Sequence, residues 1–154
     1  VEGLHILQGT TTFNREKLTF QVTAECQDLP FVGGSIDARN LTGYEIHMGR
    51  TDATGNDLHP FVVTRRSEKP CEVTVGAARR DGLAWGTYIH GIFDNDDFRR
   101  QFINGLRRQK GWQALPVSLH YREEKEEKYD RLAAVVREAL DMPTLTRIIE
   151  EGIR

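Results

Sequence analysis

Residues 85–97, WGTYIHGIFDNDD, mark the place where a strand-rich first part of the chain gives way to helices. Apolar residues alternate through Ile89, which predicts a strand, and Gly91 frees the backbone just after it. The acidic run 94–97 supplies an N-cap and a negatively charged first turn, so a helix is predicted to begin there. His90 therefore stands at the carboxyl end of a strand and just before a helix, where open α/β sheets place their sites.

Five short strands are predicted up to this point, each rich in β-branched or aromatic residues and bounded by Gly, Pro, Asp or Asn. They cover residues 18–24, 44–49, 61–65, 73–77 and 84–89. The Asp81-Gly82 pair predicts a hairpin between the last two strands. Residues 28–43, which contain Pro30 and three glycines, are interpreted as a connecting loop.

Three helices are predicted after His90. In the first, Phe98, Phe102 and Leu106 recur at helical spacing, and Gly111 ends it. The second runs from about Arg122 to Leu140 with one apolar stripe: Tyr129, Leu132, Ala133, Val136 and Leu140. The third starts after a break at residues 141–143 and is expected to face four side chains inward: Leu145, Ile148, Ile149 and Ile153. The pattern predicts an α/β fold, a mixed sheet flanked by helices, in a single domain over residues 1–154.

The composition excludes several classes of function. The chain has 154 residues, 29% charged residues and a net charge of -2, so no basic face indicates nucleic acid or an anionic membrane. The arginine pairs, such as Arg65-Arg66, are interpreted as solvated surface. The sequence has no G-x-x-x-x-G-K-[ST], G-x-G-x-x-G or H-E-x-x-H pattern and no run of 18 apolar residues.

The chain begins without methionine and without a signal-peptide pattern, so we expect a fragment of a longer protein. Its two cysteines, Cys26 and Cys71, have no CxxC partner, and a reducing cytoplasmic location is expected. Neither cysteine resembles a nucleophile. Cys26 has acidic neighbours that would raise the pKa of its thiol, and Cys71 follows Pro70 without the small flanking residues of a tight strand-to-helix turn.

His90 and His47 are the two histidines with a claim to function. An imidazole at the position of His90 can exchange protons near neutral pH, although a histidine that caps a strand and donates to a loop carbonyl fits the same position. His47 lies in residues 43–51, GYEIHMGRT, where alternation puts Glu45 and His47 on one face of a strand. From the residues alone, a buried Glu45–His47 or Glu45–Arg50 pair that supports the sheet is the better interpretation.

Residues 43–51 and 86–95 resemble two signature stretches of the cobyric acid synthase family. Residues 124–132 and 139–142 resemble the tail of that family, and residues 11–17 resemble the segment downstream of its nucleophile, so the resemblance covers nearly the whole chain. It implies the C-terminal part of a class I, triad-type glutamine amidotransferase with a flavodoxin-like fold. The family's nucleophilic cysteine would lie upstream of Val1.

The resemblance also implies roles for individual residues. His90 would act first as base and then as acid while glutamine is hydrolysed through a glutamyl thioester. Tyr44, Glu45 and His47 would bind substrate or support the site, and we predict that Glu45, His47 and His90 converge on one pocket at the carboxyl ends of adjacent strands. Many relatives carry Glu where this chain has Ile92, so the third catalytic group is unassigned, with Asp94 and Glu45 as candidates.

In such a family the ammonia passes to an ATP- and Mg-dependent synthetase domain, which amidates side-chain carboxylates of a corrin ring in cobalamin (vitamin B12) biosynthesis. The chain itself is expected to hold no cofactor and no metal, to be inactive alone, and to bind neither nucleic acid nor membrane. Its partners would be glutamine, a corrinoid through the synthetase domain, and another copy of itself if an unpaired sheet edge is exposed. The alternatives are the related cobyrinic acid a,c-diamide synthase, a peptidoglycan-precursor amidase of the same type, and a non-catalytic binding module.

Overall fold

The computed structural model describes residues 2–53 and 55–152, without the side chain of Ala53. The described chain divides into two compact units, Val1–Ser118 and Leu119–Arg154. That both belong to one amidotransferase domain stays a prediction.

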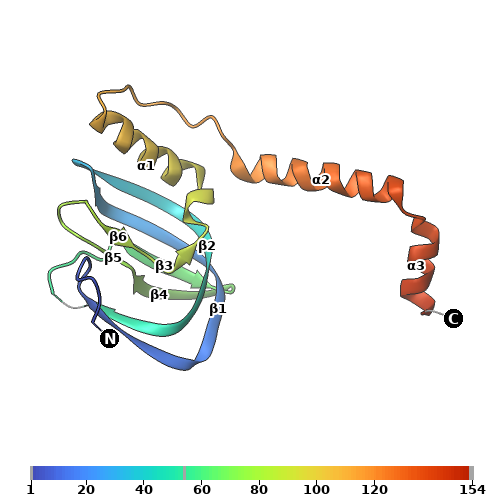
Figure 1. The fold of residues 1–154 in the computed structure, drawn as a ribbon, viewed down its shortest axis with the longest axis horizontal. Helices are drawn as coiled ribbons and strands as arrows, with labels where there is room; N and C mark the ends of the chain where they lie inside the picture. The colour runs from blue at the N-terminus through green and yellow to red at the C-terminus, as the bar shows by residue number, and fades with distance from the viewer. Residues whose placement is uncertain (1, 54, 153–154) are drawn as a thin grey trace. The chain divides into compact units, whose positions relative to one another are not determined.

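A five-stranded antiparallel sheet, in the order β4-β3-β1-β2-β7, forms most of the first unit (Figure 1). Its strands are β1 (Gly9–Phe31), β2 (Gly34–Ala53), β3 (Phe61–Arg66), β4 (Lys69–Val75) and β7 (Ile89–His90). The α/β class is confirmed. Every pairing among the described strands is antiparallel, so the predicted mixed sheet is wrong. Two-residue turns join β1 to β2 and β3 to β4, and a turn this short can join only antiparallel strands.

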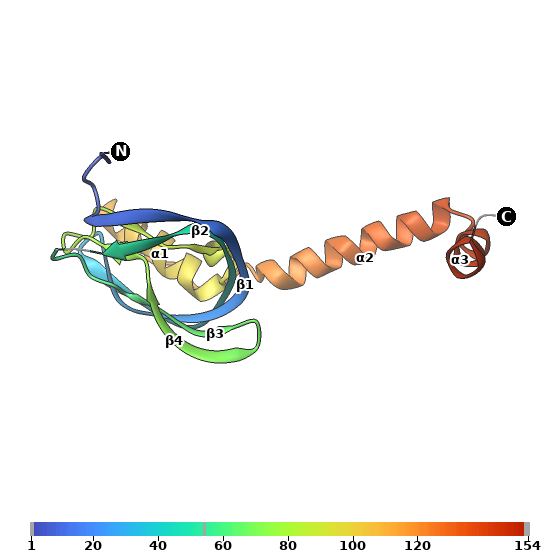
Figure 2. The ribbon, with the colours of Figure 1, turned by 90° about the horizontal axis from the view of Figure 1, so that it is seen from below.

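The predicted loop over residues 28–43 is wrong, because these residues complete a long hairpin. β1 and β2 run side by side and curve strongly (Figures 1 and 2), and they turn at Val32 and Gly33. Both turn residues have positive φ, 41° and 81°, which is the conformation of the tight turn that matches strand twist. The register of the β1–β2 ladder shifts on either side of Cys26, as at a β-bulge or similar irregularity.

The strand predicted over residues 84–89 is divided between two sheets. β6 (Trp85–Gly86) pairs with β5 (Ala77–Ala78), and this confirms the predicted hairpin through Asp81-Gly82. β7 instead pairs with β2 at the edge of the main sheet. Between them the Thr87 hydroxyl accepts a hydrogen bond from the Ile89 amide at 3.2 Å, so the chain changes sheets within two residues.

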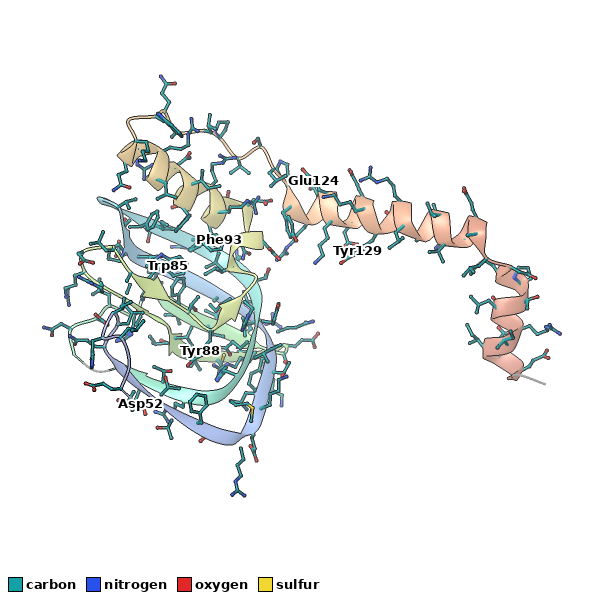
Figure 3. All side chains as sticks on the ribbon, in the orientation of Figure 1. Asp52, Trp85, Tyr88, Phe93, Glu124 and Tyr129 are labelled. Atoms are coloured by element: carbon teal, nitrogen blue, oxygen red, sulfur yellow. The ribbon has the colours of Figure 1, made fainter. Side chains whose placement is uncertain are left out.

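The core lies on one face of the sheet, under helix α1 (Asp96–Gln109) and the short 3-10 helix η1 (Ile92–Asp94). Phe98 is fully buried and its ring meets those of Phe61, Trp85 and Phe93, with centroids 5.7 to 6.3 Å apart. Figure 3 shows Trp85 and Phe93 between the strands and α1. The predicted helix is confirmed, and of its three residues at helical spacing Phe98 is buried and Phe102 packs against the core, whereas Leu106 is exposed.

The second unit consists of α2 (Tyr121–Ala139) and α3 (Met142–Glu151), which confirms both predicted helices. The Asp141 carboxylate caps α3 by accepting a hydrogen bond from the Thr144 amide at 3.1 Å. Hydrogen bonds from the Thr144 side chain and, to a smaller extent, from its amide lower the pKa of Asp141. The predicted inward packing of Leu145, Ile148 and Ile149 is wrong, since no described side chain in either helix is buried. Ile153 lies outside the described residues. Among the described residues, no helix is long and apolar enough to cross a membrane.

Replacing Phe98 with Ala tests whether α1 is held by this aromatic core. The Phe98→Ala variant should lose about 3–5 kcal/mol of unfolding free energy, because it leaves a cavity among three other rings. The matched control is Phe13→Ala, since the Phe13 side chain is 81% exposed and its removal should change little. Urea unfolding followed by circular dichroism measures both, and equal losses would show that α1 is not anchored through Phe98.

Candidate active site

His90 lies on the outer face of the sheet, opposite the core. In the β2–β7 ladder, Tyr44 is the partner of His90, and Glu45 is the partner of Ile89. Ile89 points into the core, so His90 points the other way, together with Tyr44. The two rings stack almost parallel, with centroids 5.1 Å apart and an interplanar angle of 8°.

The predicted convergence of Glu45, His47 and His90 on one pocket is wrong. Glu45 and His47 do share one face of β2, as their alternation predicts, but it is the core face. The exposed alternate positions, Tyr44, Ile46 and Met48, form the outer face that carries His90. The carboxyl ends of β2 and β7 do not meet either, because the two strands are antiparallel.

Glu45 is a structural anchor in the described geometry. Its side chain is 0% exposed, and the Arg66 guanidinium donates two hydrogen bonds to its carboxylate, from Nε to Oε2 at 2.8 Å and from Nη2 to Oε1 at 3.2 Å. The Phe20 ring lies 5.4 Å from the guanidinium carbon. Interpreting Arg65-Arg66 as solvated surface was therefore wrong for Arg66. The sequence did contain a signal for this pair: a glutamate that is predicted to be buried needs a cationic partner.

Neither residue proposed as the partner of Glu45 holds it. Arg50 pairs with Asp52 at 2.9 Å, and His47 donates from Nδ1 to the Gly49 carbonyl at 2.6 Å. The His47 ring also stacks on Tyr88, with centroids 4.6 Å apart. His47, Tyr88 and Glu45 line a cavity of about 870 Å³ (Figure 3 labels Tyr88), and neither Tyr44 nor His90 is among the described residues that line it.

The Asn95 side chain fixes the segment that carries His90. Its Oδ1 accepts from the Thr42 amide at 2.9 Å, and its Nδ2 donates to the carbonyls of Thr42 and Ile92, both at 3.0 Å. Thr42 lies two residues before Tyr44 on β2. The side-chain amide of Asn95 therefore bonds the β2 backbone just beyond the two residues of β7, as the backbone of a further strand residue would. Asn95 is the N-cap residue of α1, as its sequence predicts, but its side chain makes no capping bond.

Gly43 permits the close approach of β7. A Cβ at this position would lie 2.4 Å from the His90 carbonyl oxygen and 2.7 Å from a methyl group of Ile89. Any larger residue would push β7 away from β2. The position of His90 therefore depends on Gly43, which leaves room for β7, and on Asn95, which holds the segment after β7 to β2.

No orienting group for His90 is found among the residues that the structure describes. Glu45 is on the other face and bound to Arg66, which removes it as a candidate third group. Asp94 lies close to Gly91, 3.4 Å from the position of a Cβ there, but no hydrogen bond joins it to the His90 imidazole within residues 2–53 and 55–152. The Tyr44 ring is the contact that restrains the imidazole.

Neither cysteine lies on the His90 face. The Cys26 thiol is 1% exposed in the core and donates to the Ile36 carbonyl at 3.6 Å, and Cys71 packs against the same core. Burial, with a smaller contribution from the Asp37 carboxylate, raises the pKa of Cys26 to about 12. The predicted direction is therefore right, but burial is a larger cause than acidic sequence neighbours. A thiol with this pKa is protonated at neutral pH and is not a nucleophile.

Residues 1–98 match the CobB/CobQ-like glutamine amidotransferase domain. The chain belongs to that family. It is 42% identical over 151 residues to the cobyric acid synthase of Caldanaerobacter subterraneus subsp. tengcongensis, which covers 97% of this chain and 30% of that protein. The cobyric acid synthase of Clostridium novyi is 38% identical over 154 residues, 99% of this chain and 29% of that protein.

A more distant relative gives the same result. The cobyric acid synthase of Citrobacter koseri is 35% identical over 150 residues, which is 97% of this chain and 29% of the relative. This CobB/CobQ-like domain chain thus spans about 30% of the length of the curated relatives that it matches. No solved structure matches it. The resemblance carried by residues 43–51 and 86–95 is confirmed.

We expect the 154-residue chain to release no glutamate from glutamine above background. Its Cys26 thiol is buried and protonated, and its Cys71 thiol donates to the Val63 carbonyl, so a covalent mechanism has no nucleophile. A coupled assay for glutamate checks this. Glutamate release at enzymatic rates, lost on Cys26→Ser or Cys71→Ser, would contradict the assignment of both thiols to the core.

Removing the Asn95 amide should loosen the segment of His90. We expect Asn95→Ala to cost about 1–3 kcal/mol of unfolding free energy, because it leaves the Thr42 amide and the Thr42 carbonyl without their side-chain partner. Asn14→Ala is the control, since Asn14 is exposed on β1. Urea unfolding measures both, and an Asn95→Ala variant as stable as the control would show that the ladder needs no side-chain extension.

Proposed function

We propose that the chain is the His90-bearing part of the glutaminase of a cobyric acid synthase. The observation that carries the proposal is the placement of His90 on an exposed sheet face, fixed by Tyr44 and Asn95, in a CobB/CobQ-like glutamine amidotransferase domain. The proposed nucleophile is a cysteine in another part of the synthase, which approaches this outer face. A non-catalytic amidotransferase-like module and a cobyrinic acid a,c-diamide synthase are the rival functions.

In the proposed reaction His90 moves a proton twice. It takes the proton from the cysteine thiol as the sulfur attacks the amide carbon of glutamine, and it gives that proton to the nitrogen as the C–N bond breaks. Ammonia leaves and a glutamyl thioester remains. His90 then accepts a proton from the attacking water and returns it to the sulfur, so that glutamate and the free thiol are released.

Tyr44 supports this proton transfer by holding the imidazole plane. The parallel stack at 5.1 Å restricts rotation of the His90 ring. Within the part of the chain that the structure describes, no hydrogen bond occupies a ring nitrogen of His90, so one nitrogen can exchange the proton first with the thiol and then with the leaving group. Glu45 and His47 support the site indirectly, through β2, rather than by contact with glutamine.

The ammonia would serve an ATP-dependent synthetase part that amidates corrin-ring carboxylates in cobalamin biosynthesis. Support for this finer assignment comes from the names of the relatives and from their alignment over 97% or more of the chain. Within residues 2–53 and 55–152, no three His, Cys, Asp or Glu side chains gather as a metal site. On the family resemblance we assign ATP and Mg to the synthetase part, and no step of the glutaminase reaction is derived through them.

Replacing His90 in the full-length synthase tests the proposal. We expect His90→Asn to lower the glutamine-dependent amidation rate by about 10²–10⁴-fold, because asparagine can hydrogen-bond but cannot carry a proton. Amidation with ammonium salts should persist, since it needs no glutaminase. Both rates are followed by corrinoid product formation.

His59→Asn is the matched control, because His59 lines the core-side cavity and its Nδ1 bonds the Gly76 carbonyl at 2.9 Å. It should leave both rates near those of the natural enzyme. Equal losses with glutamine and with ammonia in His90→Asn would indicate a structural histidine. Unchanged glutamine-dependent activity would favour the non-catalytic module.

A further inference from the structure

Tyr88 departs from the alternation of the strand segment that carries His90. In a regular strand successive side chains point to opposite faces, so residues 88 and 90 would share a face. Here Tyr88 lines the core-side cavity beside His47, and Ile89 is buried in the core, whereas His90 lies on the outer face. Two successive side chains therefore point to the core side, and Tyr88 is turned away from the face that carries His90.

Both ends of the Tyr88 side chain are held by β2. Its ring stacks on the His47 imidazole, with centroids 4.6 Å apart and an interplanar angle of 23°. Its hydroxyl shares a hydrogen bond with the Thr51 hydroxyl at 2.5 Å, and Thr51 is bonded in turn to the Thr11 hydroxyl of β1 at 2.8 Å. The His47 ring is itself fixed, because its Nδ1 donates to the Gly49 carbonyl. Tyr88 is therefore tied to the β1–β2 hairpin by its ring and by its hydroxyl.

The strand that carries His90 needs such ties because it is short. β7 consists of two residues, so its backbone pairing alone adds few hydrogen bonds to the sheet. After β7, the Asn95 side chain holds the chain to Thr42 of β2. Before β7, Tyr88 makes the corresponding contacts with β2. His90 thus lies between two side-chain attachments to the same strand.

We infer that Tyr88 is a positioning residue for His90, and that His47 and Thr51 hold it in place. If Tyr88 were released, the segment before β7 could pair further along β2, since residues 84–89 alternate like one strand. The β2–β7 register would then place Tyr88 opposite Ile46, on the outer face and on the same side as His90. A phenol ring there would obstruct the approach of the nucleophile and shift the imidazole.

The inference rests on the proposed function for the step in which His90 moves a proton. A misplacement of about 1 Å can cost a catalytic step about 10²-fold in rate, so the attachment of a two-residue strand matters to the base that it carries. The inference also gives His47 a task, because its imidazole serves as the platform for the Tyr88 ring.

The test compares variants of the full-length synthase, each first shown by urea unfolding to be folded under the assay conditions. Tyr88→Phe and Thr51→Val remove opposite partners of one hydrogen bond, so each should lower kcat with glutamine about tenfold. The double variant should lose no more than either single variant, because the bond is already absent. Tyr88→Leu also removes the stack and should lower kcat about 10²-fold.

The KM for glutamine and the rate of amidation with ammonium salts should stay near those of the natural synthase in all these variants. Thr12→Val is the matched control, since it makes the same exchange as Thr51→Val at an exposed position of β1, and it should leave kcat unchanged. If Tyr88→Leu fails to fold, Tyr88→Phe and Thr51→Val still decide the outcome, because they keep the ring stack.

Hydrogen exchange separates local positioning from general stability. In Tyr88→Leu the amides of residues 87–91 should exchange faster than in the natural synthase. The amides of α1 should be unaffected, because that helix is held through Phe98. A merely structural role of Tyr88 would raise exchange in both segments.

Three results would overturn the inference. Unchanged kcat in Tyr88→Leu would mean that His90 is placed without Tyr88. Losses that multiply in the double variant would mean that the two hydroxyls act independently. A raised KM with kcat kept would make Tyr88 a glutamine-binding residue. Failure of the glutaminase assignment is distinct, because His90→Asn would then keep its glutamine-dependent rate, while exchange at residues 87–91 still reports whether Tyr88 holds the segment.

Discussion

The alternation of side chains along β2 is the constraint on which the first unit depends. Tyr44 and Glu45 are adjacent in sequence, yet one stacks on His90 in solvent and the other lies buried against Arg66. A shift of one residue in the pairing of β2 would exchange these environments, burying Tyr44 and exposing the anchor. Since an unpaired buried carboxylate is costly, the register that buries Glu45 also determines the side on which His90 stands.

The buried ion pair specifies this register more than it adds stability. Glu45 loses its water entirely, and the two hydrogen bonds from Arg66 offset that loss rather than exceed it. Its value lies in geometry, because Arg66 comes from β3 and must reach past β1 to β2. The pair therefore closes only when three strands are aligned, and any other alignment leaves a charge buried alone. An apolar pair of similar volume would tolerate slippage.

Local patterns in the sequence predicted those features of the structure that depend on interactions between residues close in the chain. The three helices, the Asp-Gly hairpin and the sharing of one face by Glu45 and His47 follow from periodicity and turn chemistry, and each agrees with the structure. The β1–β2 hairpin was missed, although Gly33-Gly34 is a hairpin signal, because Val32 at positive φ is rare for a β-branched residue. Only the rest of the hairpin, paired along both strands, holds it there.

The face of His90 was beyond sequence reasoning for a different reason. It depends on the break between β6 and β7, where Thr87 and Tyr88 carry the chain from one sheet to another. The sequence through this break alternates like one strand, so the pattern gives no sign of the change. Arg66 and Asn95 were missed similarly, since each acts through a partner more than 20 residues away in the chain.

The outer sheet face that carries His90 has a further physical meaning under the proposed function. Tyr44, Ile46 and Met48 leave apolar groups in water beside the base. Covering this face is favourable in proportion to the apolar area removed from water. It would also lower the polarity around His90, where proton transfer to and from a thiol is strengthened by the exclusion of water. Assembly would then be coupled to chemistry, because the burial that holds the parts together also creates the environment in which His90 acts. Glutamine would therefore not be hydrolysed until the part with the nucleophile is in place.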